Sequence, residues 1–153
     1  MLRVGLNPYG ITYYLGLQGR GTPRANPNGR GLNGFLEIAE ELGARTIEFH
    51  NGWFAGPGEA ELRAFRERIE RNGMTPVVSL GPPLEGVDTG IAAACAIGAR
   101  IVRLGLSPVL SGDRAAQGER WPGMVAHARR TLREFAPGAA EHGLAFAIED
   151  HQD

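Results

Sequence analysis

Short apolar runs alternate with amphipathic stretches along most of the chain. The apolar runs predict five strands, over residues 2–7, 45–50, 75–80, 101–105 and 144–149. Between them, apolar residues recur at helical spacing and predict helices over residues 32–42, 59–71, 91–97 and 125–141, with Pro137 inside the last. This regular alternation of strand and helix indicates parallel strands joined by crossover helices.

A glycine follows each predicted helix and opens directly into the next strand: Gly43, Gly73, Gly98 and Gly143. Glycine suits the left-handed conformation just past a helix end. The helix-to-strand joints are therefore short, and GARTIEF at one joint is nearly repeated as GARIVRL at another. The strand-to-helix connections are long, especially over residues 8–31 and 107–122. This asymmetry is typical of an α/β barrel, whose functional loops follow the carboxyl ends of the strands.

The length of the chain and the faces of its strands favour different folds. A complete barrel needs about 250 residues, whereas these 153 residues supply four βα units and a fifth strand, which fits an open doubly wound sheet better. However, no GxGxxG turn follows the first strand. Each strand also has one large apolar face and one small or polar face, unlike a parallel sheet that is covered on both faces. We therefore predict a partial (β/α)8 TIM barrel, with residues 1–153 as the N-terminal part of a single domain.

The two faces of the strands have separate roles in this prediction. The large apolar face is expected to meet the helices; its members are Val4, Leu6, Ile47, Phe49, Val102, Leu104, Phe146 and Ile148. The other face is expected to line the barrel and to bring polar side chains to its mouth: Asn7, Glu48, His50, Arg103 and Glu149, with Ser79 as a weaker member. Structural alternatives stay open, because Glu48 could simply pair with Arg103 inside the barrel and Asn7 could cap the following loop. For Ser79, the structural interpretation is preferred.

Two further groups of residues have both a functional and a structural interpretation. Trp53 and Phe54 follow the second strand and either wall a substrate pocket or pack over the second helix, and the pocket wall is preferred. Arg20, Arg24 and Arg30 lie in the first long loop and either bind phosphate or are solvated, and solvation is preferred.

Composition excludes several classes of protein. The net charge is −1 and the charges are mixed along the chain, which predicts no broad attraction to nucleic acid. The 23 glycines do not recur at every third residue, which excludes collagen. No apolar run approaches the ~18 residues of a membrane span, so a membrane is not an expected partner. The one cysteine, Cys95, allows no internal disulfide and lies in apolar IAAACAIGA, so we expect core packing and a cytoplasmic location.

The terminal sequence LAFAIEDHQD carries the clearest chemistry. An apolar strand delivers Glu149, and an Asp-His-Gln-Asp cluster that contains His151 follows. Hard divalent cations such as Mg²⁺ and Mn²⁺ prefer carboxylate oxygens, and imidazole also suits Mn²⁺ and Zn²⁺. A carboxylate at the carboxyl end of a barrel strand is well placed to bind a metal or to move a proton. The structural alternative is a charged, solvated fringe.

The whole chain resembles the N-terminal part of the xylose-isomerase-like TIM barrels, the sugar phosphate isomerase/epimerase group. The resemblance lies in GARTIEFH at the second strand, GMTPVVSLG at the third, GARIVRLG at the fourth and above all GLAFAIEDHQD at the fifth. The last is similar to the family's Gly-hydrophobic-Glu-Asn-His pattern. Asp150 stands in place of the frequent asparagine, and Glu149 and His151 stay in register.

The resemblance implies a metal-dependent isomerase or epimerase that acts on a sugar, sugar phosphate or related polyol by proton transfer next to a carbonyl. Glu149 would be the catalytic group and a ligand of the divalent metal (Mn, Mg, Co or Zn). The family takes further ligands, an Asp, a His and a Glu, from strands six to eight, which lie outside these residues. The small-molecule sugar would be bound by Asn7, His50, Trp53, Arg103 and His151.

Two other functions stay open. The same superfamily contains metal-dependent endonucleases that cut DNA at abasic sites. These need more His and Glu ligands and a basic groove, for which four histidines and a net charge of −1 offer little. Alternatively, the chain is a catalytically inert fragment whose exposed strand edges pair in a homo-oligomer.

Overall fold

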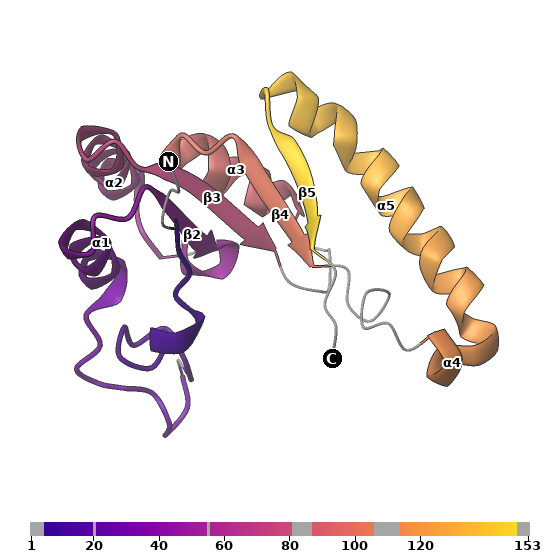
Figure 1. Ribbon diagram of the computed structural model, residues 1–153, viewed down its shortest axis with the longest axis horizontal. Coiled ribbons are helices and arrows are strands. Elements are labelled where there is room, and N and C mark those ends of the chain that lie inside the picture. The colour runs from indigo at the N-terminus through magenta and orange to yellow at the C-terminus, as the bar shows by residue number, and fades with distance from the viewer. Residues whose placement is uncertain (1–4, 20, 55, 81–86, 106–113, 150–153) are drawn as a thin grey trace.

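The computed structural model describes residues 5–19, 21–54, 56–80, 87–105 and 114–149 (Figure 1). Its strands are β1 (Gly5–Leu6), β2 (Thr46–His50), β3 (Thr75–Leu80), β4 (Ile101–Gly105) and β5 (Ala145–Glu149). Its α-helices are α1 (Gly31–Glu41), α2 (Glu59–Arg71), α3 (Val87–Ile97), α4 (Arg114–Gln117) and α5 (Trp121–Glu141). Short 3-10 helices cover Tyr9–Ile11, Asn51–Phe54 and Gly118–Arg120. The predicted alternation of strand and helix is confirmed.

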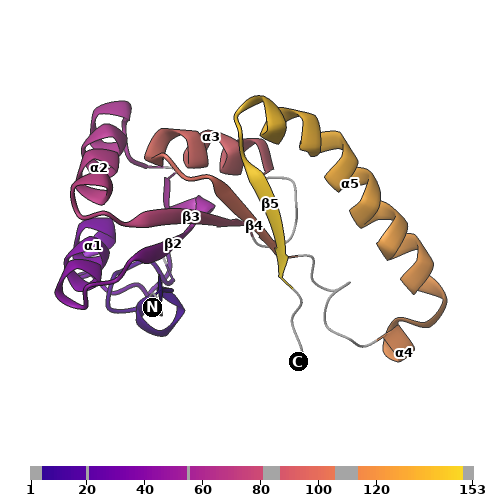
Figure 2. The same ribbon diagram turned by 45° about the horizontal axis from the view of Figure 1, so that its top comes forward.

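The strands form one parallel sheet in the order β1-β2-β3-β4-β5, so that each lies beside the strand that follows it in the chain. An open doubly wound sheet would instead reverse its strand order at a switch point. Helices α1, α2, α3 and α5 lie around the outside of the curved sheet in both views (Figures 1 and 2). This is the arrangement of a (β/α) barrel. The predicted partial barrel of four βα units and a fifth strand is therefore confirmed.

The apolar faces of β2 and β4 meet the helices, as predicted. Ile47 and Phe49 on β2, and Val102 and Leu104 on β4, are almost completely buried. The ring of Phe35 on α1 packs edge-on against Phe49, with 5.4 Å between the ring centroids. Such a contact adds about 0.5–1.5 kcal/mol to the burial of the two rings. Because the apolar face is filled in this way, the polar face of the sheet is left to form the interior of the barrel.

Strand β5 is less well covered than the strands before it. Phe146 is only partly buried and Ile148 is 53% exposed, although both lie on the predicted apolar face. The cause is that β5 is the last strand in the described sheet and that α5 buries few residues: Ala128, Thr131 and Ala139. Val4, on the same predicted face, lies outside the described residues.

The four predicted glycine joints share one backbone geometry. Gly43, Gly73, Gly98 and Gly143 have φ angles of 62°, 62°, 75° and 64°. In each case the residue after the glycine donates its N–H to a helix carbonyl five residues earlier, at 2.8–3.1 Å. These bonds are Schellman caps, which satisfy carbonyl groups at the end of a helix. The four helix-to-strand joints therefore lie at the same edge of the sheet, opposite the carboxyl ends of the strands.

Two helices begin about one turn earlier than predicted. Helix α3 begins at Val87 and α5 at Trp121, in each case before the apolar spacing becomes regular. Pro122 lies in the first turn of α5, where the missing proline N–H leaves no helical hydrogen bond unmade. Pro137 lies within α5 without ending it.

Two expectations from composition can be compared with the fold. Cys95 on α3 is a free, partly buried thiol that packs against the core, as predicted. In the described ranges, none of the helices combines the length and the apolar character that a membrane crossing requires. The cytoplasmic location stays a prediction.

Candidate functional site

The carboxyl ends of the parallel strands lie along one edge of the sheet, which we call the mouth of the partial barrel (Figure 1). Asn7 directly follows β1, His50 ends β2 and Glu149 ends β5. Glu149 pairs in register with Gly105, the last residue of β4. The backbone therefore places the predicted catalytic residue at the mouth. The predicted substrate-binding residue His151 lies outside the described residues.

Glu48 and Arg103 form an ion pair on the inward face of the sheet. The Nη2 and Nε groups of Arg103 donate hydrogen bonds to Oε1 of Glu48, at 2.6 and 3.2 Å. Asn7 donates from Nδ2 to the same oxygen at 3.1 Å. The side chains of Glu48 and Arg103 are only 18% and 15% exposed. We call Asn7, Glu48 and Arg103 the Glu48 network; it joins the start of the first loop to β2 and β4.

His50 lies at the end of β2, on the same face of the strand as Glu48. Its Nδ1 accepts the backbone N–H of Gly52 at 3.2 Å, so the neutral ring carries its proton on Nε2. Burial lowers the pKa of His50 below its ordinary value, and the charge of Arg103 lowers it further, while Glu48 opposes both. The result is a half-buried neutral imidazole whose Nε2–H is available to donate one hydrogen bond.

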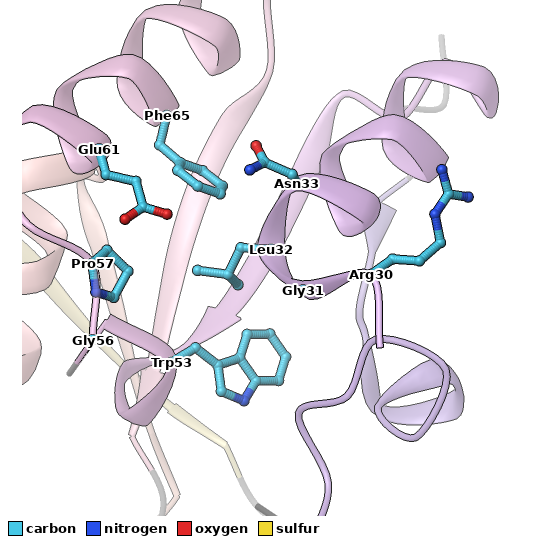
Figure 3. A pocket seen from close by; sticks show the side chains of 9 residues that line it. All are labelled: Arg30, Gly31, Leu32, Asn33, Trp53, Gly56, Pro57, Glu61 and Phe65. Atoms are coloured by element: carbon cyan, nitrogen blue, oxygen red, sulfur yellow. The ribbon is translucent and has the colours of Figure 1, made fainter. Parts of the chain in front are cut away.

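Trp53 lies beside His50, with 6.3 Å between the ring centroids. It also lines a cavity of about 300 Å³ between α1 and the start of α2. Figure 3 shows Leu32 and Phe65 on the walls of this cavity together with Trp53. This cavity lies among the helices, so the predicted role of Trp53 as the wall of a substrate pocket stays a prediction. No sequence signal marks this cavity, because Leu32 and Phe65 have the pattern of ordinary core residues.

The interpretation of Phe54 as a pocket wall is wrong. Its side chain is buried, and its ring packs edge-on against Phe49 at 5.6 Å. The preferred structural role of Ser79 is confirmed, because its buried hydroxyl donates to the carbonyl of Phe49 at 3.4 Å. The structural role of Asn7 is confirmed, because its Oδ1 accepts the N–H of Tyr9 at 2.9 Å and so caps the loop. Its contact with a substrate stays a prediction.

Among the arginines of the first loop, Arg30 is engaged by other residues of the chain. Arg30 donates to the hydroxyl of Tyr14 at 3.0 Å and forms an ion pair with Glu37. The hydrogen bond to Tyr14 is the main reason that the pKa of Arg30 is raised. Arg30 is therefore engaged in holding the loop onto α1. Arg20 lies outside the described residues.

A complete metal site is not formed by the described residues. Within residues 5–19, 21–54, 56–80, 87–105 and 114–149, no three or more His, Cys, Asp or Glu side chains are grouped so that they could hold a metal ion. By its position at the end of β5, Glu149 is one candidate ligand at the mouth. A divalent cation there would need the rest of its oxygen or nitrogen ligands from other residues.

Several crystal structures share this fold. A D-psicose 3-epimerase determined in the presence of D-fructose matches with a TM-score of 0.69 and 14% identity, over 96% of this chain and 52% of the epimerase. A D-psicose 3-epimerase with D-tagatose from Clostridium cellulolyticum H10 matches with a TM-score of 0.63 and 14% identity, over 96% and 52%. A xylose isomerase domain protein from Planctomyces limnophilus matches with a TM-score of 0.53 and 19% identity, over 77% and 49%. No protein-family model and no curated protein matches the chain.

These matches confirm the predicted resemblance to xylose-isomerase-like TIM barrels at the level of the fold. Sequence identity of 14–19% supports the shared fold, while function depends on the residues at the site. The chain spans about half the length of the structures that it matches, 49–52%.

Proposed function

We propose that this chain forms the first half of a sugar isomerase or epimerase, which moves a proton next to the carbonyl of a sugar, sugar phosphate or related polyol. The observation that carries the proposal is the mouth, where β5 brings Glu149 to the same edge as His50 and the Glu48 network. Active sites of (β/α) barrels lie at this edge. The fold shared with two D-psicose 3-epimerases and a xylose isomerase domain protein supports the reaction class.

Each proposed role follows from the chemistry of the side chain. Glu149 exchanges a proton with one face of the carbon next to the carbonyl, and a second acid-base group from outside the described residues exchanges a proton on the opposite face. His50 donates its Nε2–H to a substrate hydroxyl. Asn7 and Arg103 contact the substrate from positions that Glu48 fixes. Trp53 shields His50 from solvent, and His151 is proposed as a further contact to substrate hydroxyls.

We also propose that Glu149 is one ligand of a divalent metal ion, with Mn, Mg, Co and Zn as the candidates. A cation of this kind, when bound, supplies positive charge to the carbonyl and adjacent hydroxyl oxygens of a sugar. The other ligands come from outside the described residues in this proposal. The metal and the proton transfer therefore depend on the same carboxylate.

The test is the substitution Glu149→Gln in the complete barrel that contains this chain. Glutamine keeps the shape of the side chain but cannot accept the proton. We expect kcat to fall by about 10²-fold or more and the bound metal, measured by elemental analysis, to decrease. Glu141→Gln, at the exposed end of α5, is the matched control and should leave both values unchanged. Unchanged turnover and metal content in Glu149→Gln would remove Glu149 from both roles.

A further inference from the structure

Glu48 is more fully engaged than a catalytic carboxylate at the mouth would be. A single oxygen, Oε1, accepts hydrogen bonds from Nε and Nη2 of Arg103 and from Nδ2 of Asn7. These donors come from β4 and from the residue that follows β1, and the Glu48 side chain is largely buried, since only 18% of it is exposed. All three donors belong to the chain itself, so this oxygen is already engaged within the Glu48 network. Its geometry suits it to hold other groups in place.

The Glu48 network also sets the charge around His50. The charges of Glu48 and Arg103 cancel across a 2.6 Å contact. Among the described residues, the groups that face His50 from its neighbours are Arg103 on β4, Glu48 on its own strand and the uncharged Ser79, its register partner on β3. The pKa of His50 is lowered, chiefly by burial, so the imidazole itself adds no charge at neutral pH. Taken together, these described side chains around His50 are thus polar and carry no net charge.

A neutral, donor-bearing surface recognises hydroxyl groups better than it recognises phosphate. Phosphate binding in proteins relies on charged guanidinium or ammonium groups, often in bidentate contacts. Here the guanidinium of Arg103 is turned to a carboxylate of the chain itself and is only 15% exposed. An entering phosphate would have to displace Glu48 or to lie beside its negative charge. An uncharged polyol does not need to displace Glu48 and is not repelled by its negative charge.

We propose that Glu48 is a positioning residue that holds Arg103 and Asn7 in place and sets the mouth to accept an uncharged sugar or polyol in preference to a phosphorylated one. The inference rests on the proposed function only in taking a sugar as the ligand. Glu48 itself takes no part in proton transfer. When Glu48 loses its charge, the positive charge of Arg103 beside His50 is no longer balanced by Glu48.

The first test is Glu48→Gln in this 153-residue chain, with the His50 imidazole followed by NMR as pH is varied. Because Glu48 raises the pKa of His50 and Arg103 lowers it, loss of the Glu48 charge should lower this pKa further. Loosening or unfolding of the site would instead move it up toward the ordinary value of about 6.5. The sign of the shift therefore separates the electrostatic role from a merely structural one. No shift, or a rise, would overturn the proposal.

Two variants complete this test. Arg103→Gln should raise the pKa of His50, the opposite direction to Glu48→Gln. Glu40→Gln is the matched control, because Glu40 accepts hydrogen bonds from an arginine and an asparagine in the same way, but on the outer helices. It should leave the His50 titration unchanged. A shift in Glu40→Gln equal to that in Glu48→Gln would show a global effect and would count against the proposal.

The second test uses inorganic phosphate as the probe, with the His50 signals as the readout. The His50 signals of the wild-type chain should show no saturable response to phosphate. The Glu48→Gln variant should bind phosphate at least about tenfold more tightly than the wild type does. Adding Arg103→Gln to the Glu48→Gln variant should abolish the gain in phosphate affinity. Saturable binding to the wild type with the affinity of Glu48→Gln would overturn the proposal. Neither test needs turnover, so both can fail or succeed independently of the Glu149 assignment.

Discussion

Two glutamates of this chain make nearly the same contacts in different surroundings. Glu40 on α1 accepts two 2.6 Å hydrogen bonds from Arg68 and one from Asn72, and the hydrogen bond from Arg68 lowers the pKa of Glu40. Glu48 accepts from Arg103 and Asn7 inside the barrel. The alternation of strand residues predicts that Glu48 and Arg103 share a face. It does not predict that three donors meet at one oxygen, because that depends on the stagger of β2 against β4 and on the path of the chain after β1.

The lowered pKa of His50 links the stability of the chain to pH. The unfolded chain binds a proton at about pH 6.5, whereas folded His50 resists protonation until a lower pH. The contribution of His50 to the free energy of unfolding is therefore complete above about pH 6.5 and is lost as pH falls toward the folded-state pKa. His50→Asn keeps an acceptor for the Gly52 N–H but does not titrate in this range. We expect the free energy of unfolding in urea to decline less between about pH 7.5 and about pH 5.5 in this variant. Parallel declines in the two proteins would contradict the prediction.

At the scale of the element, the ends of helices were easier to predict than their beginnings. A single glycine marks each helix-to-strand joint, because the left-handed cap conformation selects that residue locally. The starts were less uniform: α1 and α2 begin within one residue of the prediction, whereas α3 and α5 begin about one turn earlier. Arg120, which precedes α5, makes no side-chain capping hydrogen bond. No capping residue therefore marks the start of α5 in the sequence.

The cap geometry predicts opposite effects for two glycine-to-alanine substitutions. Gly43 has a φ of 62°, and no atom lies within 4 Å of the position that an alanine Cβ would take, so Gly43→Ala should cost about 1 kcal/mol through backbone strain alone. Gly123 lies in the first turn of α5, also with open space around it, so Gly123→Ala should stabilise by roughly 0.5 kcal/mol through helix propensity. Urea unfolding of both variants provides the measurement. A Gly43→Ala variant that is as stable as the wild type, or more stable, would contradict the cap assignment at Gly43.

At the scale of the whole molecule, the faces of the strands predicted the fold better than the length of the chain. Length favoured an open doubly wound sheet, whereas the polar inward face favoured a barrel, and the consecutive strand order confirms the barrel. What the alternation could not predict is how far each apolar face is covered. In both views α5 meets β5 near the C-terminal end of the helix and diverges from the sheet toward its other end (Figures 1 and 2). Ile148 on β5 consequently stays exposed.

This uncovered edge predicts self-association of the 153-residue chain. In the described sheet β5 pairs with β4 alone, and an unpaired strand edge beside an exposed isoleucine is a template for contact with a second copy. We expect the average mass from light scattering to rise with protein concentration. Ile148→Lys should weaken this association by about tenfold or more, because it places a charge beside the edge. Leu42→Lys is the matched control, since Leu42 is 62% exposed but lies at the end of α1, away from the sheet edge. A wild-type chain that stays monomeric at all concentrations, or equal effects of the two lysines, would show that β5 is not the contact.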